Sequence, residues 1–158
     1  MVDASHADDL VTRGSVTGYL ILIGNAFIKW YSKRQNTVES STYGSELVAM
    51  RISVEALLEI RYKLRMMGLK FEDTSNLLCD NYAVILNTQL PTSNLKKKHN
   101  SVAYHKCREA VAAGIIRTGH IEGKKNLADI LTKPKTPSEH YELLKVPLFK
   151  RKSNELTH

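Results

Sequence analysis

Apolar and polar residues alternate along the N-terminal part of the chain in a way that predicts β-strands. Residues 16–23 and 26–32 are rich in β-branched and aromatic side chains and flank the turn pair Gly24-Asn25, so they predict a β-hairpin. Residues 1–3 form a third strand-like run that ends at Asp3 and is short for a strand. Trp30, in the second hairpin strand, is expected in the core.

A helical pattern follows over residues 42–67. Its apolar residues recur every three or four positions, and Gly68 ends it. Glu46 belongs to this apolar stripe, because a helical wheel places it within about 40° of Met50 and about 20° of Leu57. A carboxylate on a buried stripe needs a partner, although a position near the helix start would also let Glu46 complement the helix dipole.

The rest of the chain alternates strands with helices. We expect loops over residues 33–40 and 91–98, strands over 77–79 and 115–121, and helices over 81–87, 99–113, 126–133 and 138–145. Strands first, and then strands alternating with helices, indicate an α/β fold in which helices pack on a mixed sheet.

Composition adds a strong positive charge to this picture. The chain has 158 residues, enough for one domain with a real core, and a net charge of +7. That charge favours a polyanionic partner, with nucleic acid ahead of a membrane surface, although a solvated basic surface is the simpler explanation. The longest apolar run, residues 19–23, is far too short to span a bilayer, and we expect no signal peptide. Cys79 and Cys107 fit a reduced intracellular protein without disulfides.

Four carboxylates lie at predicted junctions. Asp3 and Asp80 end strand-like runs, while Glu46 and Asp129 lie in the first turns of predicted helices. Strand ends and helix starts can meet at one edge of an α/β sheet, and carboxylates clustered there are costly unless a divalent cation neutralises them. In a basic chain this arrangement indicates a metal-dependent nuclease.

Each carboxylate also has a structural explanation. Asp80 is a natural N-cap, and Asp129 would occupy the third position after the N-cap Asn126. Asp3 could be a turn residue, with Asp8 or Asp9 as the functional acid in its place. A zinc site is a poor alternative, because the imidazole and thiol side chains of the second half point about 200° or more apart on a helix and do not converge.

At these residues the chain resembles the RNase H domain of copia-type retrotransposon polyproteins, which follows the reverse transcriptase. The motifs occur in the family's order and spacing from residue 2 to about 146, and the closing run at 128–134 is highly specific. They read Val-Asp-Ala at 2–4, Ser-Val-Thr-Gly-Tyr at 15–19, Trp-Tyr-Ser-Lys-Arg-Gln at 30–35, Ser-Ser-Thr-Tyr-Gly-Ser-Glu at 40–46, Cys-Asp-Asn at 79–81, Lys-His at 98–99, Tyr-His at 104–105, Arg-Glu at 108–109 and Leu-Ala-Asp-Ile-Leu-Thr-Lys-Pro at 127–134.

The resemblance implies an RNase H-like fold with a five-stranded mixed sheet flanked by helices, its first strand truncated at the N-terminus. It assigns residues 1–146 to the domain and leaves 147–158 as a basic tail. It also assigns four acids to metal binding and catalysis, namely Asp3, Glu46, Asp80 and Asp129. They would hold two Mg²⁺ ions, for which Mn²⁺ substitutes, about 4 Å apart for hydrolysis of the RNA strand of RNA–DNA hybrids.

The chain departs from the family pattern at two further places. Only residues 122–125 separate a predicted strand from the turn that carries Asp129, so no loop histidine is available as a general acid, and His120 is expected in the strand itself. Tyr82 and Ala83 replace the usual Gln-Ser after Asn81. We expect Tyr82 to pack in the fold rather than to stack on substrate.

Polar and basic residues near the acids are candidates for nucleic-acid contact. Clustered lysines and arginines bind phosphates without sequence preference, and short polar side chains can reach the 2′-OH of RNA. The candidates are Lys33, Arg34, Gln35, Ser45, Asn81, Lys96, Lys97 and Lys98.

Three functions are consistent with these observations. The first is a Mg²⁺-dependent ribonuclease H in a retrotransposon polyprotein, with an RNA–DNA hybrid and the reverse transcriptase domain as partners. The short first strand and the missing histidine loop favour the second, a non-catalytic remnant that binds nucleic acid. The third is a structural domain that docks on the reverse transcriptase. We expect an intracellular, cytoplasmic or nuclear location, no membrane partner, and strand exchange between copies through the incomplete sheet.

Overall fold

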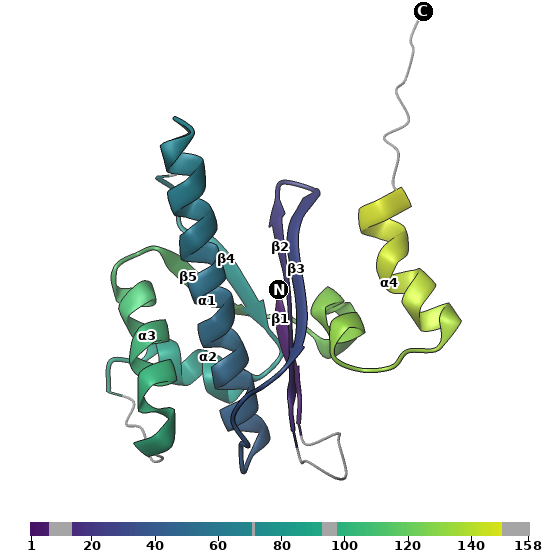
Figure 1. Ribbon diagram of the computed structural model, residues 1–158, viewed down its shortest axis with the longest axis horizontal. Coiled ribbons are helices and arrows are strands. Elements are labelled where there is room, and N and C mark those ends of the chain that lie inside the picture. Colours follow the sequence, from purple (N-terminus) through teal and green to yellow (C-terminus); the bar gives the residue numbers. More distant parts are fainter. Residues whose placement is uncertain (7–13, 71, 93–97, 150–158) are drawn as a thin grey trace, which may run out of the picture.

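Three antiparallel strands form the first sheet of the computed structural model, which describes residues 1–6, 14–70, 72–92 and 98–149. The strands are β1 (Val2–Ser5), β2 (Val16–Ile23) and β3 (Ala26–Arg34), paired in the order β1-β2-β3 (Figure 1). Gly24 has a φ of 58° in the turn between β2 and β3, a conformation that favours glycine. The predicted hairpin is confirmed, but β3 extends through Lys33 and Arg34, which were expected in a loop.

Two parallel strands form a second sheet. They are β4 (Ser75–Cys79) and β5 (Ile116–His120). β1 contacts β4, yet in the described part of the chain no ladder of hydrogen bonds joins them. The five strands of the expected mixed sheet are therefore divided into three and two. A groove of about 510 Å³ accompanies the division and lies between the end of β2 and β4.

Helices lie on both sides of the β1–β3 sheet. Helix α1 (Thr42–Met66), α2 (Tyr82–Gln89) and α3 (Ser101–Ala112) lie on one side, while the 3₁₀ helix η3 (Leu127–Leu131) and α4 (Pro137–Phe149) lie on the other (Figure 1). Two further 3₁₀ turns are η1 (Lys98–Asn100) and η2 (Gly123–Lys125). The segment predicted as a helix over residues 126–133 is thus a shorter 3₁₀ helix. α4 crosses the predicted domain boundary at residue 146, and residues 150–158 of the predicted tail lie outside the described residues.

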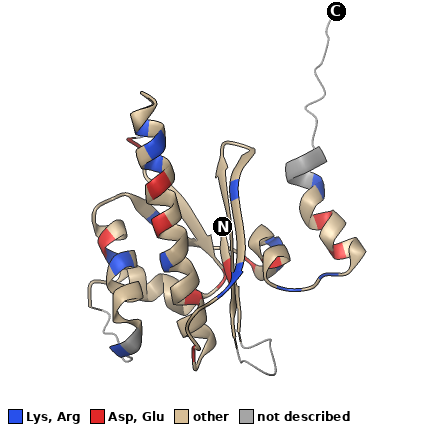
Figure 2. Ribbon diagram, viewed as in Figure 1, with Lys and Arg blue, Asp and Glu red and all other residues tan. Residues whose placement is uncertain are grey.

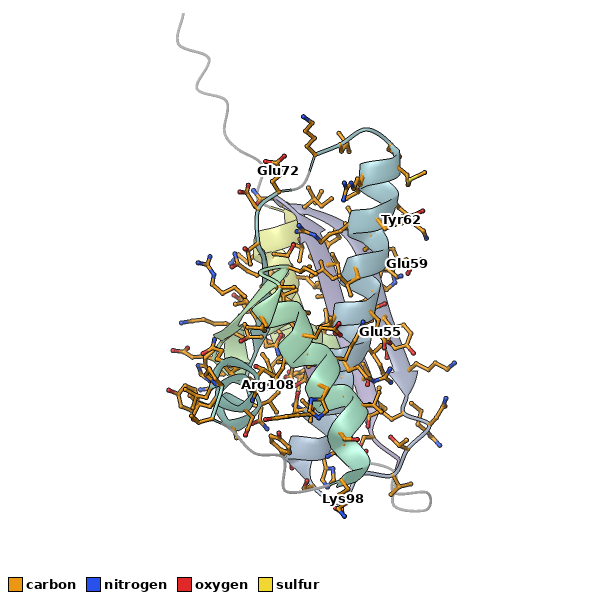
Figure 3. The ribbon with its side chains drawn as sticks, turned by 90° about the vertical axis from the view of Figure 1, so that its left-hand side faces the viewer. Glu55, Glu59, Tyr62, Glu72, Lys98 and Arg108 are labelled. Carbon is orange, nitrogen blue, oxygen red and sulfur yellow. The ribbon has the colours of Figure 1, made fainter. Side chains whose placement is uncertain are left out.

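α1 is amphipathic, as its sequence pattern predicted. Leu47, Met50 and Val54 are fully buried against β1 and β2. Glu55, Glu59 and Tyr62 project from its exposed side (Figure 3), where Arg51 and Lys63 pair with the two glutamates. On α3, Arg108 donates hydrogen bonds to the backbone oxygens of Leu90 and Pro91, so it fastens the end of α2 to α3.

Trp30 does not lie in the core. Its side chain is 67% exposed, because β3 is an edge strand whose inward positions fall on the alternate residues. Tyr31, its neighbour, faces inward and stacks on Tyr19 of β2, with ring centroids 5.0 Å apart. The predicted core position of Trp30 is therefore wrong by one step of the strand alternation.

Both cysteines are buried and free, in agreement with the prediction of no disulfide. Among the residues described, no helix combines the length and the apolar character needed to cross a membrane.

Candidate active site

Asp3 lies in the middle of β1 rather than at its end, because the strand continues to Ser5. Its side chain is fully buried. Thr132 Oγ1, at the end of η3, donates a hydrogen bond to its Oδ2 atom. Lys133 Nζ lies 3.5 Å from the same oxygen. The other oxygen, Oδ1, is buried and has no hydrogen-bond partner among the described residues. Burial raises the pKa of Asp3, although the Thr132 hydrogen bond and the Lys133 charge offset part of this effect.

Glu46 is buried on α1, as its place on the apolar stripe predicted. Its Oε1 accepts a hydrogen bond of 3.2 Å from the backbone N–H of Ala4, a group on β1 that β2 does not use. Burial first, and then the charges of Asp3 and Asp80, raise the pKa of Glu46 to about 8. Because α1 begins at Thr42, Glu46 lies beyond the first turn, and the helix-dipole explanation does not apply.

Asp80 directly follows β4 and is half-buried. The N-cap role predicted for it belongs to Asn81, whose Oδ1 accepts a hydrogen bond of 3.2 Å from the N–H of Val84. The carboxylate of Asp80 is therefore not needed to start α2. It instead approaches Glu46, and these two acids form a compact group with Cys79, in which one ligand atom from each residue lies within 4.8 Å of the others.

Cys79 is the member of this group that the sequence did not predict. Its Sγ lies 3.8 Å from Oε2 of Glu46 and accepts a hydrogen bond of 3.4 Å from the N–H of Asn81. Strand alternation sends neighbouring side chains to opposite faces, which within a strand would separate position 79 from position 80. The end of β4 removes that constraint, because the chain turns there into α2.

Asp129 lies in η3 and is held by two lysines. Lys133 Nζ is 2.5 Å from Oδ1, and Lys135 pairs with Oδ2. Burial by itself raises the pKa of Asp129, but the hydrogen bonds to Lys133 and Lys135 outweigh it, so the pKa is lowered. Asn126 caps η3 as predicted, and its side-chain amide also donates to the backbone oxygen of Val2. That bond ties η3 to β1.

Lys133 joins two of the acids and was not predicted as part of the site. It contacts both Asp3 and Asp129. Although burial lowers its pKa, the hydrogen bond to Asp129 and the charges of Asp3 and Asp129 raise it to about 12. Asp3 also interacts electrostatically with Glu46, Asp80 and Asp129. The structure thus brings all four predicted acids to one region, from β1, α1, the end of β4 and η3.

The residues fit a divalent cation. A buried carboxylate oxygen of Asp3 lacks a partner, and Glu46 holds its proton near neutral pH because it shares a buried region with two other acids. Carboxylate oxygens are the ligands that Mg²⁺ and Mn²⁺ prefer. Glu46 and Asp80 lie close enough to bind one ion, and Asp3 interacts electrostatically with both, whereas two lysines hold Asp129.

The predicted nucleic-acid contacts divide into exposed and buried residues. Lys33 and Arg34 are exposed at the end of β3, and Figure 2 shows basic residues there and along the connection to α4. Gln35 is buried, and its amide donates to Thr17 Oγ1 at 3.0 Å and to the backbone oxygen of Ser45 at 2.9 Å. The Ser45 hydroxyl is fully buried too. Gln35 and Ser45 thus support the fold instead of facing substrate, contrary to the prediction.

The remaining predicted contacts have mixed outcomes. Asn81 is half-buried and caps α2, and Lys98 is exposed in η1. Lys96 and Lys97 lie outside the described residues, as do Asp8 and Asp9.

An imidazole and a phenol stand beside Asp80. His120 ends β5, as predicted, and its Nε2 lies 3.2 Å from the backbone oxygen of Asp80. Tyr82 is 60% exposed and meets the His120 ring edge-on, with centroids 6.0 Å apart. The expected packing role of Tyr82 is therefore wrong, because the first residue of α2 lies at the protein surface.

The chain is similar in sequence to known Pol polyproteins. The chain is 30% identical over 132 residues to a retrovirus-related Pol polyprotein from transposon RE2 of Arabidopsis thaliana, covering 84% of the chain and 9% of that protein. It is 32% identical over 143 residues to the Pol polyprotein from transposon TNT 1-94 of Nicotiana tabacum, covering 90% of the chain and 11% of that protein. The chain thus spans about a tenth of the relatives it matches. No family model matches it.

Solved structures of RNase H1 enzymes share the fold. The enzyme from Halobacterium salinarum superposes with a TM-score of 0.60 at 15% identity, covering 92% of this chain and 95% of that one. LC11-RNase H1, isolated from compost, gives 0.63 at 17% identity over 83% of this chain and 89% of that one. The same enzyme in complex with an RNA/DNA hybrid gives 0.60, also at 17% identity, over 83% and 90% of the two chains.

These similarities define the chain as an α/β protein with an RNase H-like fold. In sequence it is a homologue of a segment of retrovirus-related Pol polyproteins from plant transposons, and the resemblance seen in the sequence motifs is confirmed.

Proposed function

We propose that the chain is a metal-dependent ribonuclease H that cleaves the RNA strand of RNA–DNA hybrids as part of a retrotransposon polyprotein. The observation that carries this proposal is the convergence of Asp3, Glu46, Asp80 and Asp129 from four separate elements onto one buried region. The RNase H-like fold and a structural neighbour in complex with an RNA/DNA hybrid support the choice of substrate.

In this proposal the acids hold Mg²⁺ or Mn²⁺. When bound, two such ions supply an activated water and stabilise the leaving 3′ oxygen in an in-line displacement. Asp3, Glu46 and Asp80 would bind the metal, and Asp129 would join them on releasing a lysine. The Ala4 N–H orients Glu46, and the Thr132 hydroxyl orients Asp3. Lys133 neutralises part of the acidic charge while no metal is bound.

Exposed basic residues would bind the nucleic-acid backbone. Lys33 and Arg34 extend from the end of β3, and Lys98 lies in η1, just before α3. Contacts of this kind are electrostatic, so the affinity should fall steeply as salt rises. Lys96 and Lys97 stay in the proposal as neighbours of Lys98 in the sequence.

A labelled RNA–DNA hybrid tests the proposal directly. We expect cleavage of the RNA strand in Mg²⁺, none in excess chelator, and a loss of at least about a hundredfold in Asp80→Asn, which removes a metal ligand. Asp73→Asn is the matched control, because Asp73 is an exposed acid beside β4. Full activity in Asp80→Asn, or equal loss in both variants, would contradict the assigned role of Asp80.

A second candidate function follows from the ion pairs of Asp129. Two lysines hold this carboxylate, so they compete with any metal ion for its oxygens. A non-catalytic domain that binds hybrids, or that docks on a reverse transcriptase, would keep these pairs. It would bind hybrid in a salt-dependent way, or gain stability from the reverse transcriptase domain, without metal-dependent cleavage.

The assembly and location belong to the same proposal. The reverse transcriptase domain is the expected partner, since the relatives are Pol polyproteins. Exchange of strands between two copies and an intracellular location, in the cytoplasm or the nucleus, stay predictions. Light scattering tests the first, because a strictly monomeric protein excludes the exchange.

A further inference from the structure

The candidate active site contains one soft metal ligand, the sulfur of Cys79, among the hard carboxylate oxygens of Glu46 and Asp80. The Sγ atom of Cys79 is 3.8 Å from Oε2 of Glu46, and a carboxylate oxygen of Asp80 completes a group whose ligand atoms lie within 4.8 Å of one another. Metal–ligand bonds of about 2.0–2.3 Å place the ligands of a tetrahedral ion roughly 3.3–4 Å apart. Small rotations of the side chains therefore suffice for all three residues to bind one ion.

Two further contacts prepare this group for a metal. Burial and the charge of Glu46 raise the pKa of the Cys79 thiol, and the backbone N–H of Asn81, which donates to Sγ at 3.4 Å, offsets part of this rise because it stabilises the thiolate. Asp3 Oδ1 is fully buried and has no hydrogen-bond partner within the described residues, although Asp3 interacts electrostatically with Glu46, Cys79 and Asp80. Asp3 thus adds a buried negative charge that favours a cation bound by the three ligands.

We propose that Cys79, Glu46 and Asp80 form a site for a thiophilic divalent cation such as Zn²⁺ or Cd²⁺. A thiolate selects such ions over Mg²⁺, which prefers oxygen and keeps its waters. Binding forms the metal–sulfur bond and releases the Cys79 proton to solvent. The bound ion uses oxygens of Glu46 and Asp80, so it competes with Mg²⁺ for them.

The consequence for activity rests on the proposed nuclease function, whereas the binding itself does not. If the chain is the proposed ribonuclease, Zn²⁺ inhibits hybrid cleavage and excess Mg²⁺ relieves the inhibition. In a Cys79→Ser variant, the Mg²⁺-dependent cleavage that remains should lose most of its sensitivity to Zn²⁺, because serine removes the soft ligand.

Direct metal titration tests the site without any cleavage assay. Cd²⁺ bound to a thiolate gives an ultraviolet charge-transfer band, and calorimetry measures Zn²⁺ affinity in the same protein. We expect the band at one ion per chain in the wild type, its loss in Cys79→Ser, and a Zn²⁺ affinity lowered at least about tenfold. Cys107→Ser is the matched control, because Cys107 is also buried and free but lies on α3.

Several outcomes would overturn the proposal. They are a folded wild type with no band, a band that persists in Cys79→Ser, and a band lost equally in Cys107→Ser. If Cys79→Ser does not fold, Glu46→Gln replaces it, since this variant keeps the thiol and should weaken the band. A protein that shows the band but does not cleave hybrids would contradict the proposed function and leave the metal site intact.

Discussion

The charge of Glu46 depends on burial more than on its position in the helix. Its pKa of about 8 lies well above the ordinary value of 4.5, because the carboxylate is removed from water and faces Asp3 and Asp80. The positive charge of Lys133 offsets the repulsion between the carboxylates at Asp3 and Asp129. Lys133, which the sequence analysis left out of the site, thus adjusts the charge of the predicted acids.

The raised pKa of Glu46 makes the stability of the metal-free protein depend on pH. The folded state binds a proton that the unfolded state releases between about pH 4.5 and about pH 8. The free energy of unfolding should therefore fall as the pH rises through this window, by up to about 1.4 kcal/mol per pH unit for one group. Asp3, whose pKa is also raised, acts in the same direction.

Denaturant unfolding in chelator from pH 5 to pH 9 measures this slope. Glu46→Gln should flatten it, because the amide does not titrate, and Mg²⁺ should raise the stability of the wild type most at the alkaline end. A slope that is unchanged in Glu46→Gln would assign the effect to other groups.

Lys133 should stabilise the protein only while no metal is bound. Lys133→Met removes the charge that compensates Asp3 and Asp129 but keeps the apolar stem. Since this lysine is partly exposed, we expect a loss of about 1–2 kcal/mol in the free energy of unfolding. Added Mg²⁺ should restore most of it. Lys145→Met, an exposed lysine of α4, is the matched control and should change little in either condition.

At the level of elements, the close packing of η3 on β2 positions two of the acids. Gly18 pairs with Asp3 across the β1–β2 ladder, and a Cβ atom at this glycine would lie 2.6 Å from Thr132 Cγ2 and 3.0 Å from the backbone oxygen of Ala128. The absence of a side chain therefore lets η3 approach closely enough for Thr132 to bind Asp3.

Gly18→Ala should push η3 away from the sheet. We expect a loss of about 1–3 kcal/mol from overpacking and weaker Mg²⁺ binding, because Asp3 and Asp129 would be displaced relative to each other. Gly24→Ala serves for comparison, since its Cβ meets open space and its cost is the positive φ alone, about 1 kcal/mol. Equal effects of the two substitutions on Mg²⁺ affinity, measured by calorimetry, would contradict this account.

The periodicity of apolar residues predicted most boundaries of the strands and helices, but not every contact that their side chains make. The hairpin at Gly24 and the long helix followed from periodicities that burial enforces on each side of a sheet or helix. The prediction that Trp30 lies in the core was wrong, because strand alternation shows that the two faces differ but not which face is covered. The N-cap of α2 is Asn81, whereas the sequence predicted Asp80. Both residue types cap helices well, and only the path of the chain selects between them.

On the scale of the whole molecule, a groove lies between the two sheets, and exposed basic residues lie at the end of the edge strand β3. The groove lies between the end of β2 and β4, and Met1 is one of its lining residues. Lys33 and Arg34 lie at the opposite end of the β2–β3 hairpin from its turn. A nucleic-acid backbone near this end would meet positive charge close to the strand that carries Asp3.

Substitution of these basic residues should change the salt dependence of hybrid binding. Lys33→Gln and Arg34→Gln should each weaken binding of a non-cleaved hybrid and reduce the slope of log affinity against log salt by about one, whatever the base sequence. Lys63→Gln on the exposed side of α1 is the control. A slope that stays the same in the first two variants, or falls equally in the third, would place the nucleic acid elsewhere.

The sequence by itself determined the fold class and the order of the elements, and it predicted the four candidate acids, because strand and helix periodicities and a specific run of motifs are properties of the chain alone. The tertiary structure decided which side chains meet. It placed Cys79 beside Glu46, set Lys133 between Asp3 and Asp129, buried Gln35 and Ser45, and exposed Trp30 and Tyr82. Charge, metal preference and exposure depend on neighbours that are distant in the chain, and only packing brings those neighbours together.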